Sequence, residues 1–303
     1  MKKKCDISFI VVNYNGAEHT RGLLSSFLFY LSDYDYEVIV VDNGSKYNEA
    51  ADLEREFPQF IYIRSELNLG FSGGNNLAIR IASKEFIMLI NNDAYLIDSS
   101  VIRLSTFLRE RGDVGAVSPK ILFERPEGYI QYAGFTEFSP VFLRNKAIGY
   151  MSPDIGQYNI SSRVWSTHGA AMMVKKEVLS YSGLMPEIYF LYYEEFDWCN
   201  KIKEAGYEIW YNPDCVVVHK EGSTTKGISS LKNYYLTRNR LLYAFRNLRG
   251  VSKGLSIIYQ LFIVLPKEVI KLMIIGNFNK AFAVLKGAWS FIRLKDKNVK
   301  VFL

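Results

Sequence analysis

Cysteine is scarce in this chain of 303 residues, which contains Cys5, Cys199 and Cys215 and no others. Their odd number and wide spacing exclude a disulfide framework, and no two of them have the short spacing of a zinc site. A chain of this kind suits a reducing compartment. We therefore expect a cytoplasmic protein.

Long uninterrupted hydrophobic runs are also missing. The apolar run behind the N-terminal lysines is broken by Asn13 and Asn15, too early for a signal peptide, so it predicts a strand. The run Ser256–Phe278 is strongly apolar, but Pro266 and Lys267 stand in its middle. A membrane-spanning helix needs about 20 residues with few or no charges. The sequence therefore predicts no spanning helix.

Acidic residues are nearly absent from the C-terminal tail. Residues 238–303 contain 13 of the 37 Lys and Arg residues but only 2 of the 31 Asp and Glu residues. The basic excess of the chain thus belongs to the tail, which argues against a protein that coats nucleic acid. We expect no nucleic-acid partner and an anionic membrane surface as the partner of the tail.

The first part of the chain alternates β-rich apolar runs with helical segments. Near-continuous apolar strands that alternate with helices predict a parallel sheet covered on both faces. The expected strands are 7–12, 37–41, 60–63 and 86–90, a further strand is expected near 114–122, and the expected helices are 17–31, 48–57, 74–82 and 99–111.

Polar clusters follow these strands. They are Asn13–Gly16, Asp42–Ser45, the glycine-rich loop Asn68–Asn76, and Asn91–Asp93. In doubly wound sheets, ligands bind beyond the carboxyl ends of the strands. Each cluster alone could be a simple turn, because Asn, Asp and Gly favour turns. Four such clusters together predict a ligand site at one sheet edge.

The second half is less regular. Residues 123–160 predict hairpins or loops, with a mobile flap as one interpretation, and 164–179 predict a strand that leads into a helix. A helix is expected over 189–207, and one or two strands over 208–222, around Pro213.

Four acidic or basic groups are candidates for chemistry near the strand ends. Asp93, with its neighbouring amides, suits a hard cation such as Mg²⁺ or Mn²⁺. Asp42 is placed to accept hydrogen bonds from a base or ribose, or else to cap the next helix. His219 follows an apolar run, as a metal ligand or phosphate contact would, and His168 lines the same cleft or packs in the core.

The segment "YEEFDWC" places Glu194, Glu195 and Asp197 within four positions. Like charges at this spacing raise at least one pKa, which suits a general base. The alternative is an acidic first turn of a helix, favoured by the helix dipole. The aromatic neighbours Tyr192, Tyr193, Phe196 and Trp198 suit stacking against sugar faces.

Together, these motifs resemble glycosyltransferase family 2, inverting enzymes with the GT-A fold, and within it the rhamnosyltransferase-like enzymes of bacterial surface-polysaccharide assembly. The matching words, in order, are "VVNYNG", "VVDNGS", "NLGFSGGNN", "LINND", "HGAAMMVKKEVL", "YYEEFDWCNKIKEAGY" and "VVHKEGS". The resemblance covers roughly residues 7–240. It implies an α/β, Rossmann-like, mostly parallel central sheet flanked by helices, with a C-terminal amphipathic helical extension.

The resemblance also implies roles for the site residues. Asp93 and His219 would bind the divalent metal, Mg²⁺ or Mn²⁺, and Glu195 would be the base, in place of the family's usual aspartate. The implied contacts to a nucleoside-diphosphate sugar are Asn13, Asn15, Asp42, Asn68, Asn76, Asn91 and Asn92. The implied contacts to the acceptor are His168, Glu194, Asp197, Trp198 and Arg238. Pro186 stands where the family often has an aspartate.

The expected organisation is a GT-A domain over 1–237, with a nucleotide-sugar half (about 1–118) and an acceptor half (about 119–237), followed by the tail 238–303. The tail helices would lie in the membrane interface, or else pack in the core or form a homodimer. The resemblance implies a glycan or polyprenyl-diphosphate-linked acceptor, and a peripheral protein on the inner face of the bacterial plasma membrane. A nucleotidyltransferase and a non-catalytic sugar- or membrane-binding scaffold are the alternatives.

Overall fold

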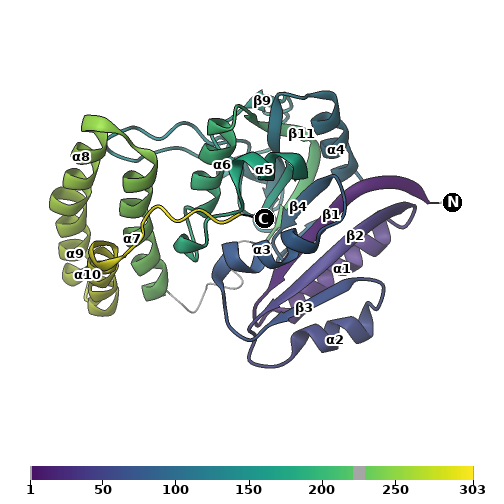
Figure 1. Ribbon diagram of the computed structural model, residues 1–303, viewed down its shortest axis with the longest axis horizontal. Helices are drawn as coiled ribbons and strands as arrows, with labels where there is room; N and C mark the ends of the chain where they lie inside the picture. Colours follow the sequence, from purple (N-terminus) through teal and green to yellow (C-terminus); the bar gives the residue numbers. More distant parts are fainter. Residues whose placement is uncertain (1, 221–228, 303) are drawn as a thin grey trace.

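The computed structural model describes residues 2–220 and 229–302, and a mixed sheet runs through its larger part (Figure 1). Over the described residues the sheet has 11 strands in the order β3-β2-β1-β4-β10-β6-β11-β5, with β7, β8 and β9 joined at its margin. The strands are β1 (Lys3–Asn13), β2 (Tyr34–Asn43), β3 (Ile61–Ser65), β4 (Phe86–Ile90), β5 (Ala94–Leu96), β6 (Val114–Phe123), β7 (Tyr129–Tyr132), β8 (Ser152–Pro153), β9 (Ser162–Arg163), β10 (Ala171–Lys175) and β11 (Glu208–His219).

Strand pairing confirms the expected mostly parallel centre. The pairs β1–β2, β1–β4, β2–β3 and β6–β11 are parallel, whereas β10 runs antiparallel between β4 and β6. The carboxyl ends of β1, β2 and β4 therefore meet at one edge, as the apolar runs predicted.

Helices pack against this sheet, and those of the C-terminal tail form a layer beside it (Figure 1). They are α1 (Ala17–Tyr30), α2 (Glu49–Glu56), α3 (Gly70–Ile81), α4 (Val101–Glu110), α5 (Leu179–Ser182), α6 (Glu194–Glu204), α7 (Ser229–Asn247), α8 (Gly250–Tyr259), α9 (Leu265–Ile274) and α10 (Phe278–Arg293). Shorter turns are η1 (Lys176–Val178), η2 (Glu187–Tyr189) and the π-helical η3 (Gln260–Val264).

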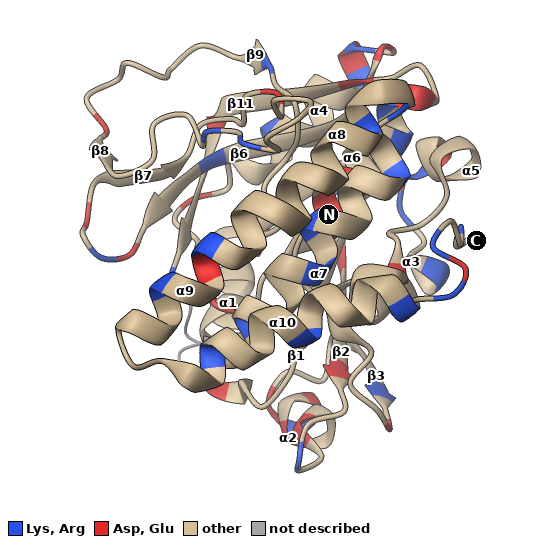
Figure 2. Ribbon diagram, turned by 90° about the vertical axis from the view of Figure 1, so that its left-hand side faces the viewer, with Lys and Arg blue, Asp and Glu red and all other residues tan. Residues whose placement is uncertain are grey.

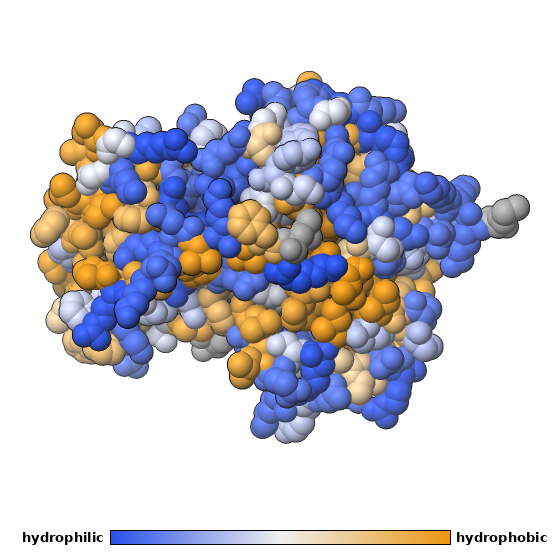
Figure 3. All heavy atoms as spheres, viewed as in Figure 1, coloured by the Kyte–Doolittle hydropathy of each residue, from blue (hydrophilic) through white to orange (hydrophobic). Residues whose placement is uncertain are grey.

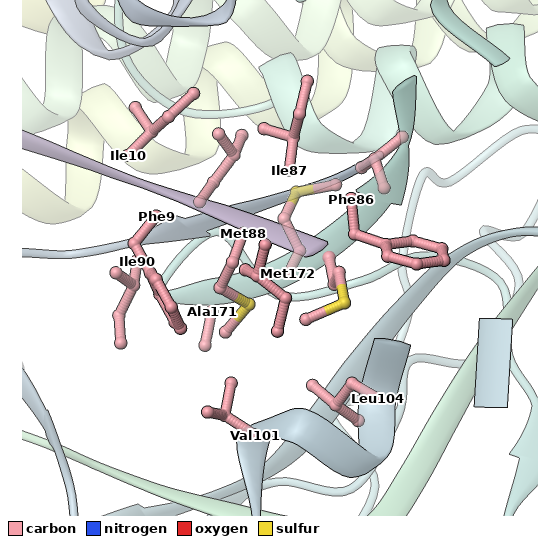
Figure 4. Close-up of a cluster of buried hydrophobic side chains, with 14 of the residues drawn as sticks. Phe9, Ile10, Phe86, Ile87, Met88, Ile90, Val101, Leu104, Ala171 and Met172 are labelled. Atoms are coloured by element: carbon pink, nitrogen blue, oxygen red, sulfur yellow. The ribbon is translucent and has the colours of Figure 1, made fainter. Parts of the chain in front are cut away.

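The main core lies between the sheet and these helices. Every residue of β4 is buried, as expected for a central strand covered on both faces. The ring of Phe9 packs 4.6 Å from that of Phe27 in α1, and Figure 4 shows Val101 and Leu104 of α4 beneath the strands that carry Phe9 and Met88. Burial of these side chains fixes the sheet edge on which the polar clusters stand.

Two local expectations were wrong. The predicted glycine-rich loop is partly helical, because α3 begins at Gly70 and not at Gly74. The predicted helix over 189–207 begins only at Glu194, because the residues before it have left-handed backbone. The expectation of one or two strands over 208–222 is met by one strand, β11, which has a register shift near Pro213; positions 221–222 of that prediction lie outside the described residues.

The tail forms a helical layer beside the sheet domain. α10 packs along α7, and α8, η3 and α9 form one helical run from Gly250 to Ile274. Pro266 lies in the first turn of α9, directly after the π-helical turn that accommodates its missing N–H. None of the helices described is both long enough and apolar enough to cross a membrane. The expected boundary at 237/238 falls inside the uninterrupted α7.

Candidate active site

Asp93 and His219 face each other at the end of the central strands. Asp93 lies between β4 and β5, and the antiparallel pairing of β5 with β11 brings His219 opposite Ala94. His219 Nε2 is 3.0 Å from Asp93 Oδ1, and both side chains are buried. The structure thus brings together the two residues expected to bind a metal.

The second nitrogen of His219 indicates what this pair can bind. His219 Nδ1 lies 2.8 Å from Gln131 Oε1, an oxygen that can only accept, so in a neutral ring Nδ1 carries the proton. Nε2 then presents a lone pair toward a carboxylate oxygen, and Asn91 Nδ2 lies 3.4 Å from the same nitrogen. The lone pairs of His219 Nε2 and Asp93 Oδ1 therefore face each other, an arrangement that a proton or a cation between the two atoms would stabilise.

The donor atoms fit a divalent cation that is completed by substrate. Carboxylate oxygen and imidazole nitrogen together suit Mn²⁺, and carboxylate oxygen also suits Mg²⁺. Within residues 2–220 and 229–302, no group of three or more His, Cys, Asp and Glu could hold a metal alone. A cation at Asp93 and His219 would therefore need further oxygen ligands, which phosphates and waters usually supply.

Several amides at this edge hold the loops in place. Asn13 Nδ2 donates to Glu49 Oε2 (2.7 Å), and Thr20 Oγ1 donates to Asn13 Oδ1 (2.8 Å). Asn92 Nδ2 reaches Thr20 Oγ1 (3.2 Å) and the carbonyl of Gly16 (3.3 Å). Asn13 and Asn92 are buried, so these contacts give them a positioning role beneath the surface of the site.

Asp42 joins the ends of β2 and β3. Its carboxylate is fully buried and pairs with Arg64 at 2.8 Å. It also accepts from the backbone N–H groups of Ser45 and Ala50. Asn15 is exposed beside it, and its Oδ1 accepts from the N–H of Lys46. Arg64 was not singled out from the sequence, although it directly follows the expected strand 60–63.

The start of α3 contacts the segment before α6. Asn68 Oδ1 accepts from the N–H of Gly70 at 2.8 Å, and Phe71 N donates to Phe190 O at 2.7 Å. Gly70 has φ +72°, and a Cβ there would lie 2.2 Å from Phe190 O, so only glycine fits. The glycine-rich segment is therefore tied directly to the loop that precedes Glu194.

Asn76 strengthens the same connection further along α3. Its Nδ2 donates to Met185 O and to Glu187 Oε1, both at 2.8 Å, and its Oδ1 accepts from the N–H of Met185. The side chain is buried and fully engaged by the protein. This places Asn76 in the framework of the site and away from a bound ligand.

The loop before α6 has an unusual backbone. The backbone φ angles of Phe190, Tyr192 and Tyr193 are 64°, 70° and 77°, values that residues other than glycine seldom adopt. Such conformations cost about 1–3 kcal/mol each and persist only where the surroundings hold them. Strain of this kind is concentrated at active sites, and here it directly precedes the carboxylates of α6.

Two neighbouring residues of α7 hold that loop. Asn239 Nδ2 lies 3.0, 2.7 and 2.8 Å from the carbonyl oxygens of Tyr189, Leu191 and Tyr192. Arg238 donates to the carbonyls of Ile188 and Tyr189, and its Nε fixes Asn239 Oδ1 at 2.8 Å. We call Arg238 and Asn239 the loop clamp. Arg238 is therefore engaged with backbone, away from the acceptor contact that the resemblance implied.

Glu195 lines a cleft of about 740 Å³ between the 136–146 segment, α6 and α7. Desolvation raises the pKa of Glu195 to about 7, which suits a general base at neutral pH. Its neighbour Glu194 is buried, and burial raises the pKa of Glu194 well above its usual range. Of the aromatic side chains expected to stack on sugars, three line this cleft: Tyr192, Tyr193 and Phe196.

Two other residues of the acidic segment point into the core. Trp198 is fully buried and its indole N–H donates to Gly183 O, so no face of the ring is open to a sugar. Asp197 is fully buried against Arg246, at 2.5 Å from its Nε. The acceptor contacts expected of Trp198 and Asp197 do not match these positions, because both side chains are fully buried and engaged with Gly183 and Arg246.

His168 lies between Phe135 and His219. Its ring stacks on Phe135 and its centroid is 6.3 Å from that of His219. Its Nδ1 accepts from the N–H of Ala170, and desolvation lowers its pKa to about 3. His168 is therefore a neutral packing partner of the metal-site histidine.

Comparison with known proteins finds relatives in sequence. The model of glycosyl transferase family 2 matches residues 8–178. A low-salt glycan biosynthesis hexosyltransferase of Haloferax volcanii is 28% identical over 78% of this chain and 75% of its own length. A dTDP-rhamnosyl transferase of Shigella flexneri is 24% identical over 80% of this chain and 81% of its own.

Solved structures agree in fold. A mannosyltransferase from Pyrobaculum calidifontis, in complex with GDP-mannose and Mn²⁺, superposes with a TM-score of 0.59 over 96% of this chain and 88% of its own, at 16% identity. At this identity the match concerns the fold alone, and it confirms the expected α/β GT-A architecture.

Proposed function

The chain belongs to glycosyl transferase family 2, and on this premise we propose that it moves a sugar from a nucleoside-diphosphate sugar to a glycan or lipid-linked acceptor in polysaccharide synthesis. The observation that carries the proposal is the Asp93–His219 pair at the carboxyl ends of the strands. The contact of α3 with the loop before α6 ties this end of the sheet to the Glu195 cleft.

Asp93 and His219 would hold a divalent cation, Mg²⁺ or Mn²⁺, which when bound neutralises charge on a departing nucleoside diphosphate. Glu195 takes the proton of the acceptor hydroxyl. The acceptor oxygen then attacks the anomeric carbon from the face opposite the leaving group, and the configuration inverts. No covalent intermediate with the enzyme is needed, so a single base suffices.

Some residues at the strand ends would contact the nucleotide-sugar donor, and others hold the loops that carry them. Asn15, Asn68 and Asn91 retain exposed surface at the strand ends and form the donor side of the site. Asp42, expected to contact the donor, is fully buried and supports this side through its pairing with Arg64. Asn13, Asn76 and Asn92 keep the loops beneath in position through the hydrogen bonds described above. The name of the Shigella relative makes dTDP-rhamnose the first donor to test.

The tail helices form the membrane-facing side in this proposal. Exposed apolar side chains gather over α8–α10 (Figure 3), among them Phe262, Ile274, Phe282 and Trp289. Lys and Arg are interspersed along α9 and α10 (Figure 2). Basic helices with one apolar face lie in the headgroup region of anionic bilayers. The enzyme would thus act as a peripheral protein on the cytoplasmic face of the plasma membrane.

Calorimetric binding of dTDP, UDP, GDP and ADP, each with and without Mn²⁺, tests the proposal. One nucleotide should bind to the wild type with Mn²⁺, and Asp93→Ala should lose the metal-dependent part. Asp98→Ala, outside the site on the same connection, is the matched control and should bind as the wild type does. Absence of all nucleotide binding by the wild type would favour a non-catalytic scaffold.

A further inference from the structure

The Glu195 cleft has a strongly one-sided charge. Arg144 and Lys146 stand on the irregular segment between β7 and β8, and Arg240 enters from α7. Among the described residues that line the cleft, Glu195 is the one carboxylate. None of the three cations has a salt-bridge partner within the described parts of the chain.

The amide group of Asn145 also favours an anion in this cleft. Asn145 stands between Arg144 and Lys146 and also lines the cleft, and its Nδ2 is buried with no hydrogen-bond partner in the described structure. A buried donor of this kind is costly unless a ligand or water satisfies it. Three cations and one unpaired N–H donor together complement an anion with several oxygen acceptors.

The position of Arg240 indicates where the anion would lie. Its Nε donates to the hydroxyl of Tyr193, at 3.0 Å, which leaves the other guanidinium nitrogens for another acceptor. Arg240 also lines a smaller cavity of about 190 Å³ between α7, α9 and α10, together with Gln260 and Glu268. It therefore stands between the Glu195 cleft and the apolar tail helices.

We propose that Arg144, Lys146, Arg240 and Asn145 form a phosphate-binding subsite for the acceptor. The acceptor would then be an anionic amphiphile, with its sugar at Glu195, its phosphate or diphosphate at the cations and its apolar chain toward α8–α10. Guanidinium groups suit this task, because their planar N–H donors match phosphate oxygens. This inference rests on the proposed function, since it assigns the acceptor of the same reaction.

Binding of decyl diphosphate to the full chain tests the subsite, with Mn²⁺ and the preferred nucleoside diphosphate present at saturation to fill the donor site. Decyl maltoside serves as the neutral amphiphile of equal chain length, and pyrophosphate as the free anion. We expect decyl diphosphate to bind at least about tenfold more tightly than decyl maltoside. The variant Arg144→Gln/Lys146→Gln should weaken that binding about tenfold or more, and Arg240→Gln should do the same.

The control Lys280→Gln/Lys286→Gln removes two cations from α10, outside the cleft, and should leave the affinity for decyl diphosphate unchanged. The subsite is refuted if the cleft variants bind decyl diphosphate as the wild type does. It is also refuted if they lose affinity only for vesicles with anionic lipid, because the cations would then contact headgroups. Pyrophosphate bound as tightly as decyl diphosphate would likewise refute an acceptor that extends to the tail.

Nucleotide binding in the same variants separates this inference from the proposed function. The cleft variants could keep metal-dependent nucleotide binding and also bind decyl diphosphate as the wild type does. That result would refute the subsite and leave the glycosyltransferase proposal standing. Loss of nucleotide binding by the wild type would overturn both.

Discussion

At the scale of single residues, the chemistry depends on where one carboxylate is placed. Glu195 lines a cleft, while Glu194 and Asp197 of the same helical turn are buried. The three acidic side chains of this turn therefore have different surroundings. Of the three, Glu195 alone lines the cleft, and its pKa is raised to about 7.

Replacement of this carboxylate gives the first prediction. Glu195→Gln keeps the shape of the side chain but cannot accept a proton, so kcat should fall by about 10²–10⁴-fold. Metal-dependent nucleotide binding should persist. Glu204→Gln, at the other end of α6, is the control and should retain normal turnover. Normal kcat in Glu195→Gln would refute its role as the base.

The raised pKa of Glu195 gives the second prediction, on pH. A base must be deprotonated to act, so kcat/KM for the acceptor should rise with pH up to an apparent pKa of about 7 and level off above it. Because Glu194 lies next to it, the measured value belongs to the pair. A pH–rate profile between pH 5 and 9 measures this. A rising limb centred near 4.5, the ordinary value, would contradict the effect of burial.

The sequence predicted some of the site residues and missed the roles of others, because only some of these roles follow from local patterns. Asp93, His219 and Glu195 stand at strand ends or next to aromatic residues, and those patterns are local. The hydrogen-bond partners of Asn13 and Asn76 and the burial of Trp198 depend on segments far away in the chain. Gln131 and Asn239 gave no signal, because each acts through contacts about 50 to 90 residues away.

At the scale of elements, the loop before α6 and helix α7 form one unit. The loop clamp supplies the donors that hold Tyr189, Leu191 and Tyr192 while three residues keep positive φ. The position of Glu195 thus depends on a helix that follows it by more than 30 residues.

Loss of the clamp gives the third prediction. Asn239→Ala removes the donor that holds the Leu191 and Tyr192 carbonyls, while the Tyr189 carbonyl keeps Arg238 and the N–H of Leu191 as donors. A buried carbonyl left without a partner costs about 1–3 kcal/mol. We expect kcat to fall about tenfold or more while the Kd of the nucleotide stays unchanged. Asn247→Ala, on the same helix but bonded to Asn200, is the control. Equal kcat in the two variants would mean that the loop holds its shape without the clamp.

The contact between α3 and the loop gives the fourth prediction. Gly70→Ala places a Cβ 2.2 Å from Phe190 O at a position with φ +72°, so the free energy of unfolding should fall by about 1–3 kcal/mol. Gly22→Ala, where a Cβ meets nothing within 4 Å, should be neutral or stabilising. Urea unfolding of both variants measures the difference. An unchanged midpoint for Gly70→Ala would contradict the close approach.

Element boundaries show where sequence periodicity fails. The segment 189–207 has helical spacing, but tertiary contacts from α7 and α3 impose a left-handed backbone on its first residues. The glycines of 70–74 suggested a loop, yet they lie in the first turns of α3, where a Cβ at Gly73 or Gly74 would collide with Leu69 or Val12. Such close approaches are set by distant segments.

At the scale of the whole molecule, the sheet was the predictable part and the packing of the tail was not. Apolar runs separated by helices are enough to indicate a parallel sheet with its ligand edge. The amphipathic tail helices were expected, but amphipathicity alone does not say which protein surface they meet. In the structure α7 and α10 pack together and cover the side of the domain that carries the Glu195 cleft.

The exposed face of the tail gives the fifth prediction. Ile274→Glu/Phe282→Glu places charges at side chains that are 80% and 67% exposed, and should reduce binding to vesicles of anionic lipid at least about tenfold. Ile155→Glu/Ile160→Glu, each 81% exposed but far along the chain from the tail, is the control. Vesicle cosedimentation measures both. Unchanged binding with altered oligomeric state would assign the face to a homodimer.

The clamp also bears on how the enzyme can be shortened. A chain cut at residue 237 would keep every sequence word of its family yet discard Arg238 and Asn239, and with them the donors that hold the loop before Glu195. Such a fragment should still bind nucleotide and should turn over poorly. Truncation from the C-terminus should therefore spare α7 and its packing partner α10, because this part of the tail holds the loop that positions Glu195.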